Sequence, residues 1–469
     1  MLFNSLVFLI FGALFYAGWP MLRRFSNVRW GYLVVASFVF YGWWDWRFLI
    51  LIVASGLLDF IVGLAIERYP LRRKLLLAIS IVGNVGSLAT FKYLTFLTIN
   101  ANQLLAAAGA GWHIPLAELT LPVGISFYTF QSMSYTIDIY RGSLRPTRNI
   151  LHFFAYLSMF PQLVAGPIIR AADLLPQLES GEPATQEQRW NGLVRIVHGY
   201  FKKVVIADNL APAVNAAFAG GDGGSALYWW LVVTMFAFQI YCDFSGYSDI
   251  ARGLANWMGY HFPENFNHPY IARSLRDFWT RWHISLSTWF RDYVYIPLGG
   301  SKQGKFGSLR NMWITMVVSG LWHGAAWTFV IWGGIHAFCL MIERLTDWPR
   351  RISAWPGGRY LASAVLLTQV WVAWVFFRAA SLGQALDVVG HMFASAGSTL
   401  SEIRSLGIVP LAVVAGAIVR EGYFYFGMDG PHVLSESWRR RLDPLFLAMA
   451  ITACIFLRGP GGAFIYFQF

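Results

Sequence analysis

Charged side chains are scarce in this chain of 469 residues, because Asp, Glu, Lys and Arg together make up 13% of it. Soluble globular domains carry roughly 25%. Acidic residues are the scarcer kind: 24 stand against 36 basic ones, which gives a formal net charge of +12. This composition excludes an ordinary soluble domain. The hydrophobic content of 57% indicates a membrane protein instead.

Cysteine is also scarce. The three cysteines, Cys242, Cys339 and Cys454, all lie in apolar segments and have neither redox nor metal-ligand spacing. We interpret them as small buried hydrophobic side chains. The sequence therefore predicts no metal site.

Long apolar runs are abundant, and they predict an all-α polytopic membrane protein. A membrane-spanning helix needs about 20 mainly apolar residues, and we expect eleven to thirteen transmembrane or re-entrant helices. The first run, Leu2 to Pro20, lacks a basic start and a small-residue cleavage site, so we expect a retained anchor. We expect one domain over residues 1–469, with N-terminal helices in 1–120, a catalytic core in 121–345 and C-terminal helices in 346–469.

The basic residues lie between apolar runs, as the positive-inside rule describes. Basic and poorly charged loops alternate along the first spans, which predicts an N-terminus outside and basic loops in the cytoplasm. The segment 262–308 should then be cytoplasmic and amphipathic. This distribution suits contact with membrane lipids and excludes a nucleic-acid partner.

The stretch from Leu275 to Tyr293 has its apolar residues on one stripe at helical spacing, which predicts one interfacial amphipathic helix. His283 lies at the edge of this stripe, and Arg276 and Ser287 lie on the same flank. Because Ser287 is four residues after His283, their side chains can meet. A structural interfacial histidine and a functional histidine both fit this spacing.

His323 is unusual because no Asp, Glu, Lys or Arg occurs between Asn311 and Ile342. A helix that begins near Arg310 would carry it roughly 20 Å into the membrane. An ionisable group at such depth is a candidate functional residue by default. The spacing of Gly320 and Gly324 allows close helix packing. The alternative is a neutral histidine bonded to a buried carbonyl, or a role of the glycines in packing alone. We expect His336 to be structural.

Two motifs carry a family resemblance: "NFNHPYIARSLRDFWTRWHISLSTWFRDYVYIPLGG" from Asn265 and "SGLWHGAAWTFVIWGGIHA" from Ser319. Together with "LPVGISFYTFQSMSYTIDIYRG" from Leu121, they resemble the membrane-bound O-acyltransferase (MBOAT) superfamily. The residues of these motifs are most similar to those of the bacterial branch that O-acetylates alginate. The resemblance implies the MBOAT fold, a ring of tilted helices around a central tunnel.

The same resemblance implies that His323 is the catalytic histidine and that His283 is the second functional position. His323 would act as general base for an acceptor hydroxyl. His283, with Arg276 or Ser287, would position a cytoplasmic thioester donor. Acetyl-CoA is the expected donor, as a substrate and not as a bound cofactor.

The tetrahedral intermediate of acyl transfer needs hydrogen-bond donors. Candidates near His323 are Ser319 and Trp322, and candidates from other segments are Tyr128, Gln131 and Asn265. The sequence does not rank them.

The expected acceptor is a secreted polysaccharide such as alginate, reached directly or through a periplasmic acetyl-accepting or acetyltransferase partner protein. The resemblance implies the inner membrane of a bacterium. O-acetylation of peptidoglycan or another cell-wall polymer and D-alanyl transfer to teichoic acid stay open. A polytopic transporter is the alternative of another class, and it predicts substrate flux without covalent change.

Overall fold

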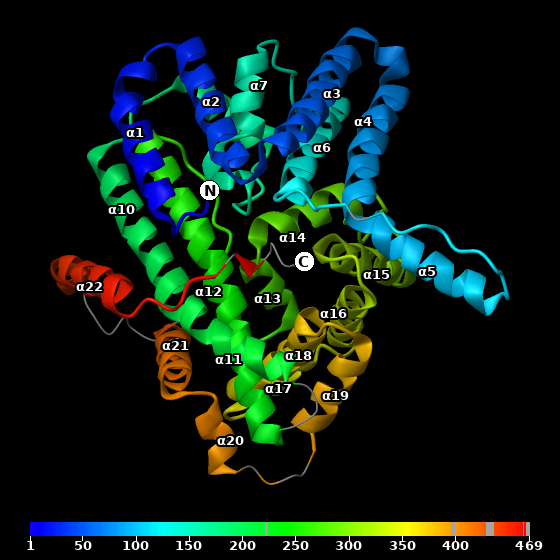
Figure 1. The fold of residues 1–469 in the computed structure, drawn as a ribbon, viewed down its shortest axis with the longest axis vertical. Helices are drawn as coiled ribbons and strands as arrows, with labels where there is room; N and C mark the ends of the chain where they lie inside the picture. Colours follow the sequence, from blue (N-terminus) through cyan, green and yellow to red (C-terminus); the bar gives the residue numbers. More distant parts are fainter. Residues whose placement is uncertain are drawn as a thin grey trace. The chain divides into compact units, whose positions relative to one another are not determined.

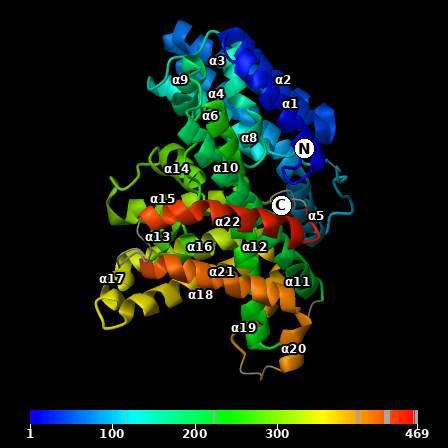
Figure 2. The same ribbon diagram turned by 90° about the vertical axis from the view of Figure 1, so that its left-hand side faces the viewer.

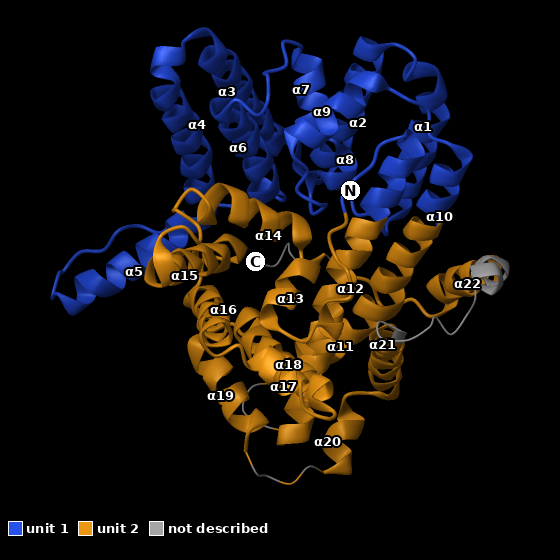
Figure 3. Ribbon diagram, turned by 180° about the vertical axis from the view of Figure 1, so that it is seen from behind, with its two compact units in different colours: residues 1–193, 250–263 blue, residues 194–249, 264–469 orange. Residues whose placement is uncertain are grey.

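The computed structural model describes residues 1–117, 119–220, 224–394, 397, 399–427, 436–462 and 464–465. Every regular element in these ranges is helical, and the chain divides into two compact units (Figures 1 and 3). Unit 1 contains residues 1–193 and 250–263, and unit 2 contains residues 194–249 and 264–469. The expected division at residues 120 and 345 stays a prediction.

Unit 1 consists of helices and the turns and longer loops that join them. Its elements are α1 (Leu6–Leu22), α2 (Ser26–Asp45), η1 (Trp46–Phe48), α3 (Leu49–Arg68), η2 (Pro70–Arg72), α4 (Arg73–Leu88), η3 (Ala89–Tyr93), α5 (Leu94–Ala107), α6 (Ile125–Arg141), α7 (Ile150–Leu157), α8 (Phe160–Leu163) and α9 (Ala171–Ser180). A buried carboxylate ties three of them together. Asp59 on α3 accepts hydrogen bonds from Ser80 and Asn84 on α4 and from Ser132 on α6. These hydrogen bonds satisfy both oxygens of the buried carboxyl group.

Two helices have residues in both units, α10 (Gln186–Tyr200) and α12 (Ala226–Met258). The elements wholly in unit 2 are η4 (Phe201–Ala207), α11 (Asp208–Ala219), η5 (Pro269–Ile271), α13 (Leu275–Arg281), α14 (Ile284–Phe290), η6 (Arg291–Tyr295), α15 (Gly304–His323), α16 (Trp327–Thr346), α17 (Trp348–Ser353), α18 (Gly358–Arg378), α19 (Leu382–Met392), α20 (Leu400–Ser405), α21 (Ile408–Gly427) and α22 (Glu436–Phe456). Figure 2 shows α21 and α22 on the same side of unit 2, and both contact η4.

The structure confirms an all-α polytopic membrane protein. Six helical stretches among the described residues are long and apolar enough to cross a membrane: 26–68, 70–107, 226–258, 327–346, 358–378 and 408–426. Two shorter apolar helices, Leu6–Leu22 and Pro444–Phe456, accompany them. The sidedness of the chain and the depth of His323 stay predictions.

Helices α15 and α16 form a hairpin whose helices touch through their backbones. A Cβ atom on Gly320 would overlap the carbonyl oxygen of Phe329, and a Cβ atom on Gly333 would overlap that of Met316. Each glycine therefore permits an approach that no side chain would allow. This hairpin fixes the backbone position of His323, the last residue of α15.

The prediction of one continuous helix from Leu275 to Tyr293 is wrong. The helix breaks at His283, whose backbone is left-handed with φ of 41°. The amides of Ile284 and Ser285, which would continue the helix, donate instead to the main-chain and side-chain oxygens of Asn265. Tertiary hydrogen bonds have replaced the helical ones.

Candidate active site

His323 lies in unit 2 in a pocket of aromatic rings. Its side chain is 3% exposed. Its ring centroid is 5.0 Å from that of Trp322, 4.9 Å from that of Trp332 and 5.2 Å from that of Phe377. An imidazole among such rings is shielded from bulk water, which strengthens electrostatic interactions with any substrate that reaches it.

Trp322 connects the two predicted catalytic histidines. Its indole centroid is 6.2 Å from the His283 ring and 5.0 Å from the His323 ring. Both contacts are edge-on, with interplanar angles of 69° and 79°. The structure thus brings His283, Trp322 and His323 together in one unit, although 40 positions separate the histidines in sequence.

His283 is completely buried, and polar and aromatic groups both contact it. Its Nδ1 lies 3.1 Å from Oδ1 of Asn265, and its ring meets Phe244 edge-on with centroids 4.6 Å apart. Burial lowers the pKa of His283 to about 3, so the imidazole is neutral at physiological pH. A neutral imidazole can accept a proton or polarise a bound group.

Phe464 and Ile465 contact two neighbouring residues of α12, Phe244 and Asp243. Phe464 lies against Phe244, with centroids 5.6 Å apart. The amide of Ile465 donates to a carboxylate oxygen of Asp243 at 2.7 Å, and Lys203 pairs with the other oxygen of Asp243 at 2.8 Å. Phe464 therefore packs against a ring that itself contacts His283.

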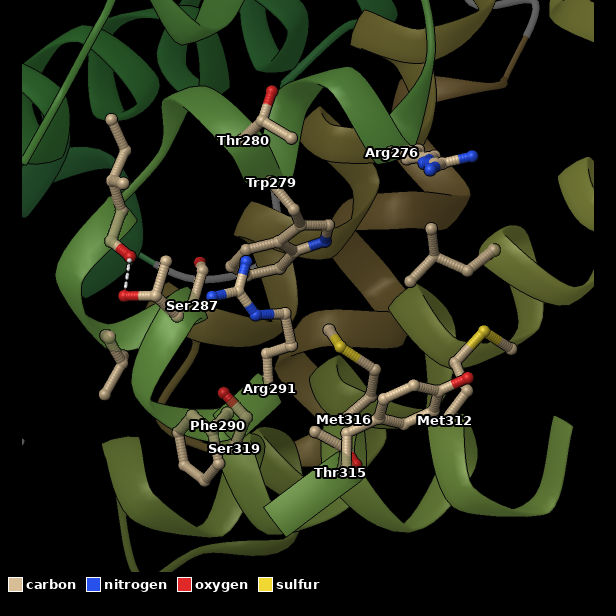
Figure 4. A pocket seen from close by; sticks show the side chains of 15 residues that line it. Arg276, Trp279, Thr280, Ser287, Phe290, Arg291, Met312, Thr315, Met316 and Ser319 are labelled. Carbon is tan, nitrogen blue, oxygen red and sulfur yellow. Dashed lines mark hydrogen bonds between the residues drawn. The ribbon is translucent and has the colours of Figure 1, made fainter. Parts of the chain in front are cut away.

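Three other predicted residues line one cavity of about 460 Å³ in unit 2. Figure 4 shows Arg276, Ser287 and Ser319 around it, on α13, α14 and α15. Most of the lining is apolar and includes Met312 and Met316. The Ser287 hydroxyl donates to the carbonyl of Trp282 at 3.2 Å.

A second cavity, of about 700 Å³, shares Arg276 and Tyr295 with the first. Its lining is more polar and includes Arg344, Arg350 and Glu343. The cavity with Ser287 and Ser319 therefore adjoins one with three arginines. Neither lining includes His283 or His323.

The predicted oxyanion donors fall in different places. Tyr128 and Gln131 are buried on α6 in unit 1, whereas the site described above belongs to unit 2. Asn265 contacts His283, and one of its amide hydrogens is used by Ser248, since Nδ2 lies 3.2 Å from that hydroxyl. The role of oxyanion donor stays a prediction for Ser319, Trp322, Tyr128 and Gln131.

Sequence analysis missed several residues of the site. Trp332 and Phe377 shape the surroundings of His323, and Ser285 binds the asparagine that holds His283. In a chain with 22 tryptophans and 38 phenylalanines, no spacing distinguishes these rings from ordinary core residues. Among the described residues, no three His, Cys, Asp or Glu side chains are grouped so as to hold a metal ion.

Comparison with known proteins identifies the class. A family model described as the membrane-bound O-acyltransferase family, MBOAT, matches residues 141–382, a range that contains both histidines. The chain is 40% identical to a probable alginate O-acetylase of Pseudomonas putida, over 91% of this chain and 87% of that protein. It is 34% identical to a peptidoglycan O-acetyltransferase of Helicobacter pylori, over 79% of this chain and 75% of that protein. It is 29% identical to a teichoic acid D-alanyltransferase of Bacillus subtilis, over 56% of this chain and 70% of that protein.

These matches and the helical architecture define a multi-pass membrane O-acyltransferase. The chain belongs to the membrane-bound O-acyltransferase family.

Proposed function

We propose that this protein transfers acetyl groups from a cytoplasmic thioester to hydroxyls of a secreted polysaccharide, with alginate the first candidate. The observation that carries the proposal is a buried imidazole, His323, within the matched part of the chain. The similarity to alginate O-acetylases over most of the chain supports the choice of polymer.

In the proposed reaction His323 is the general base. Its imidazole removes the proton of the acceptor hydroxyl as the oxygen attacks the thioester carbonyl carbon. The tetrahedral intermediate then collapses, the carbon–sulfur bond breaks, and the thiolate leaves and takes the proton back from the imidazolium. His283, neutral because it is buried, positions the donor.

The two adjoining cavities suit a donor such as acetyl-CoA. The mainly apolar cavity has room for an acyl-pantetheine arm, and the arginines of the second cavity complement phosphate groups. Arg276 lines both cavities, so its guanidinium can bind phosphate where the arm ends.

Arg276→Gln should raise the KM for acetyl-CoA about fivefold, because an exposed charge pair contributes up to about 1 kcal/mol. The KM for acetyl-pantetheine, which lacks the nucleotide phosphates, should not change. Acetyl transfer by purified protein with each donor measures both values.

Arg281→Gln is the matched control. Arg281 lies on the same helix and pairs with Asp277 at 2.8 Å, but it lines neither cavity. Its KM values should equal those of the unchanged protein. An equal rise for both donors in Arg276→Gln would argue against phosphate recognition by this arginine.

The acceptor is the polymer itself or a periplasmic partner protein that passes the acetyl group on, with the enzyme in the inner membrane and its N-terminus outside. The test is a deletion strain complemented with the gene and supplied with radiolabelled acetate. Label should enter the secreted polysaccharide as alkali-labile ester. A polymer without label despite normal expression would disprove the proposal, and flux without ester formation would favour a transporter.

Peptidoglycan O-acetylation is the second candidate, because the chain is 34% identical to such an enzyme over 79% of its length. The same experiment separates the two candidates when peptidoglycan is isolated alongside the secreted polymer. Ester label in the peptidoglycan alone would select the second candidate.

A further inference from the structure

Asn265 makes an unusual set of contacts with the loop that carries His283. Its Oδ1 lies 3.2 Å from the backbone nitrogen of Ser285, 2.9 Å from the Ser285 hydroxyl and 3.1 Å from Nδ1 of His283. Asn265 and His283 are both completely buried. One side-chain oxygen thus lies within hydrogen-bond distance of three polar groups, at a site where water does not compete for these bonds.

These contacts determine the orientation of the asparagine. The backbone N–H of Ser285 can only donate, so the amide atom facing it must be the oxygen and not the nitrogen. The position of the amide nitrogen fits the same orientation, because Nδ2 lies 3.2 Å from the Ser248 hydroxyl, which can accept a hydrogen bond.

The orientation of Asn265 then determines the protonation of His283. An amide oxygen accepts hydrogen bonds and cannot donate them, so Nδ1 of His283 must carry the hydrogen. In a neutral imidazole only one nitrogen is protonated, and the lone pair therefore belongs to Nε2. The ring neighbours Phe244, Phe266 and Trp322 carry no charge that would oppose this state.

The backbone holds the same arrangement in place. The carbonyl of Asn265 accepts from the amide of Ile284 at 2.9 Å, and the amide of Asn267 donates to the carbonyl of Arg281 at 2.9 Å. The segment 265–267 therefore pairs with both sides of the helix break. This pairing keeps His283 in its left-handed conformation and its ring beside Oδ1.

We propose that Asn265 is a positioning residue of the acyl transfer: it holds His283 in the Nδ1–H tautomer and leaves Nε2 as the acceptor nitrogen of the ring. This role rests on the proposed function, because it defines which nitrogen of the second histidine donates a hydrogen bond and which one can accept. It replaces the role of oxyanion donor that the sequence left open for Asn265.

Three purified variants test the proposal in the acetyl-transfer assay. Asn265→Ala removes the acceptor and frees the ring to change tautomer. Asn265→Asp keeps the acceptor oxygen beside Nδ1 of His283 and replaces the amide nitrogen that faces Ser248 with a second acceptor oxygen. Asn311→Ala is the matched control, because Asn311 is equally buried and bonds the carbonyl of Gly300 at 3.1 Å away from the cavity linings.

We expect Asn265→Ala to lower kcat by a factor of about 10 to 100, the range seen when a group that orients an essential imidazole is lost. Asn265→Asp should keep most of the activity at pH 8. Its carboxylate raises the pKa of His283 from about 3, so protonation should inactivate this variant at higher pH than the unchanged protein. The acid limb of the kcat profile should therefore move upward in pH. Asn311→Ala should stay within about threefold of the unchanged protein.

Size-exclusion profiles and thermal unfolding identify variants that do not fold, and Asn265→Asp keeps the test valid if Asn265→Ala is one of them. Full activity in folded Asn265→Ala would overturn the positioning role, and so would an unshifted acid limb in Asn265→Asp. If the unchanged protein transfers no acetyl group in this assay, the proposed function fails instead. The two failures are thus distinguishable.

Discussion

His323→Ala is expected to reduce acetyl transfer at least 1,000-fold while the protein remains folded in the membrane. General-base catalysis contributes about 10²- to 10⁴-fold, and the aromatic rings around His323 leave little room for a solvent base to replace it. The measurement is acetyl transfer by purified protein, with folding checked by size exclusion and thermal unfolding.

His336→Leu is the matched control for this loss. His336 is 2% exposed on α16, and none of the described residues bonds its Nε2. Replacing an unsatisfied buried polar group with an apolar one of similar size is nearly neutral or stabilising. Activity should stay within about threefold. Near-normal turnover in His323→Ala, or an equal loss in both variants, would contradict the assignment of the base.

Gly320→Ala should have the second largest effect, on stability and activity together. The added methyl group would overlap the carbonyl oxygen of Phe329, and a backbone atom cannot move aside as a flexible side chain can. Overpacking usually costs about 1–3 kcal/mol, and we expect the upper end here. His323 lies three residues later on the same helix, so its displacement should also lower activity roughly 100-fold. Thermal unfolding and the acetyl-transfer assay measure the two effects.

Gly416→Ala provides the comparison, because a methyl group there meets no atom within 4 Å. It lies within α21, where alanine favours the helix by roughly 0.5–1 kcal/mol. This variant should be as stable as the unchanged protein or slightly more so. If both alanine variants unfold at the same temperature, close backbone contact at Gly320 is not what holds the hairpin.

The sequence predicted the class of fold because it depends on composition. The absence of charges around His323 also made this histidine a candidate, and its catalytic role stays a prediction. The absence of charged residues around His323 can be read directly from the sequence, and so can apolar segments long enough to cross a membrane. The glycine spacing at Gly320 also predicted close packing, which the α15–α16 hairpin confirms.

The break at His283 could not be predicted from periodicity. Its cause is Asn265, 18 positions earlier, which takes the hydrogen bonds that would have continued the helix. Similarly, the rings of Trp332 and Phe377 come from two other helices, and only the tertiary fold selects them among the many aromatic residues. Tyr128 and Gln131 belong to unit 1, and their role as donors stays a prediction.

The indole of Trp322, which contacts both imidazoles, limits proton transfer between them. An indole nitrogen can give a hydrogen bond but has no lone pair with which to receive a proton. A proton released at one histidine therefore does not reach the other along this contact. Any proton exchange between the two imidazoles must therefore follow a route other than Trp322, although the indole contacts both rings.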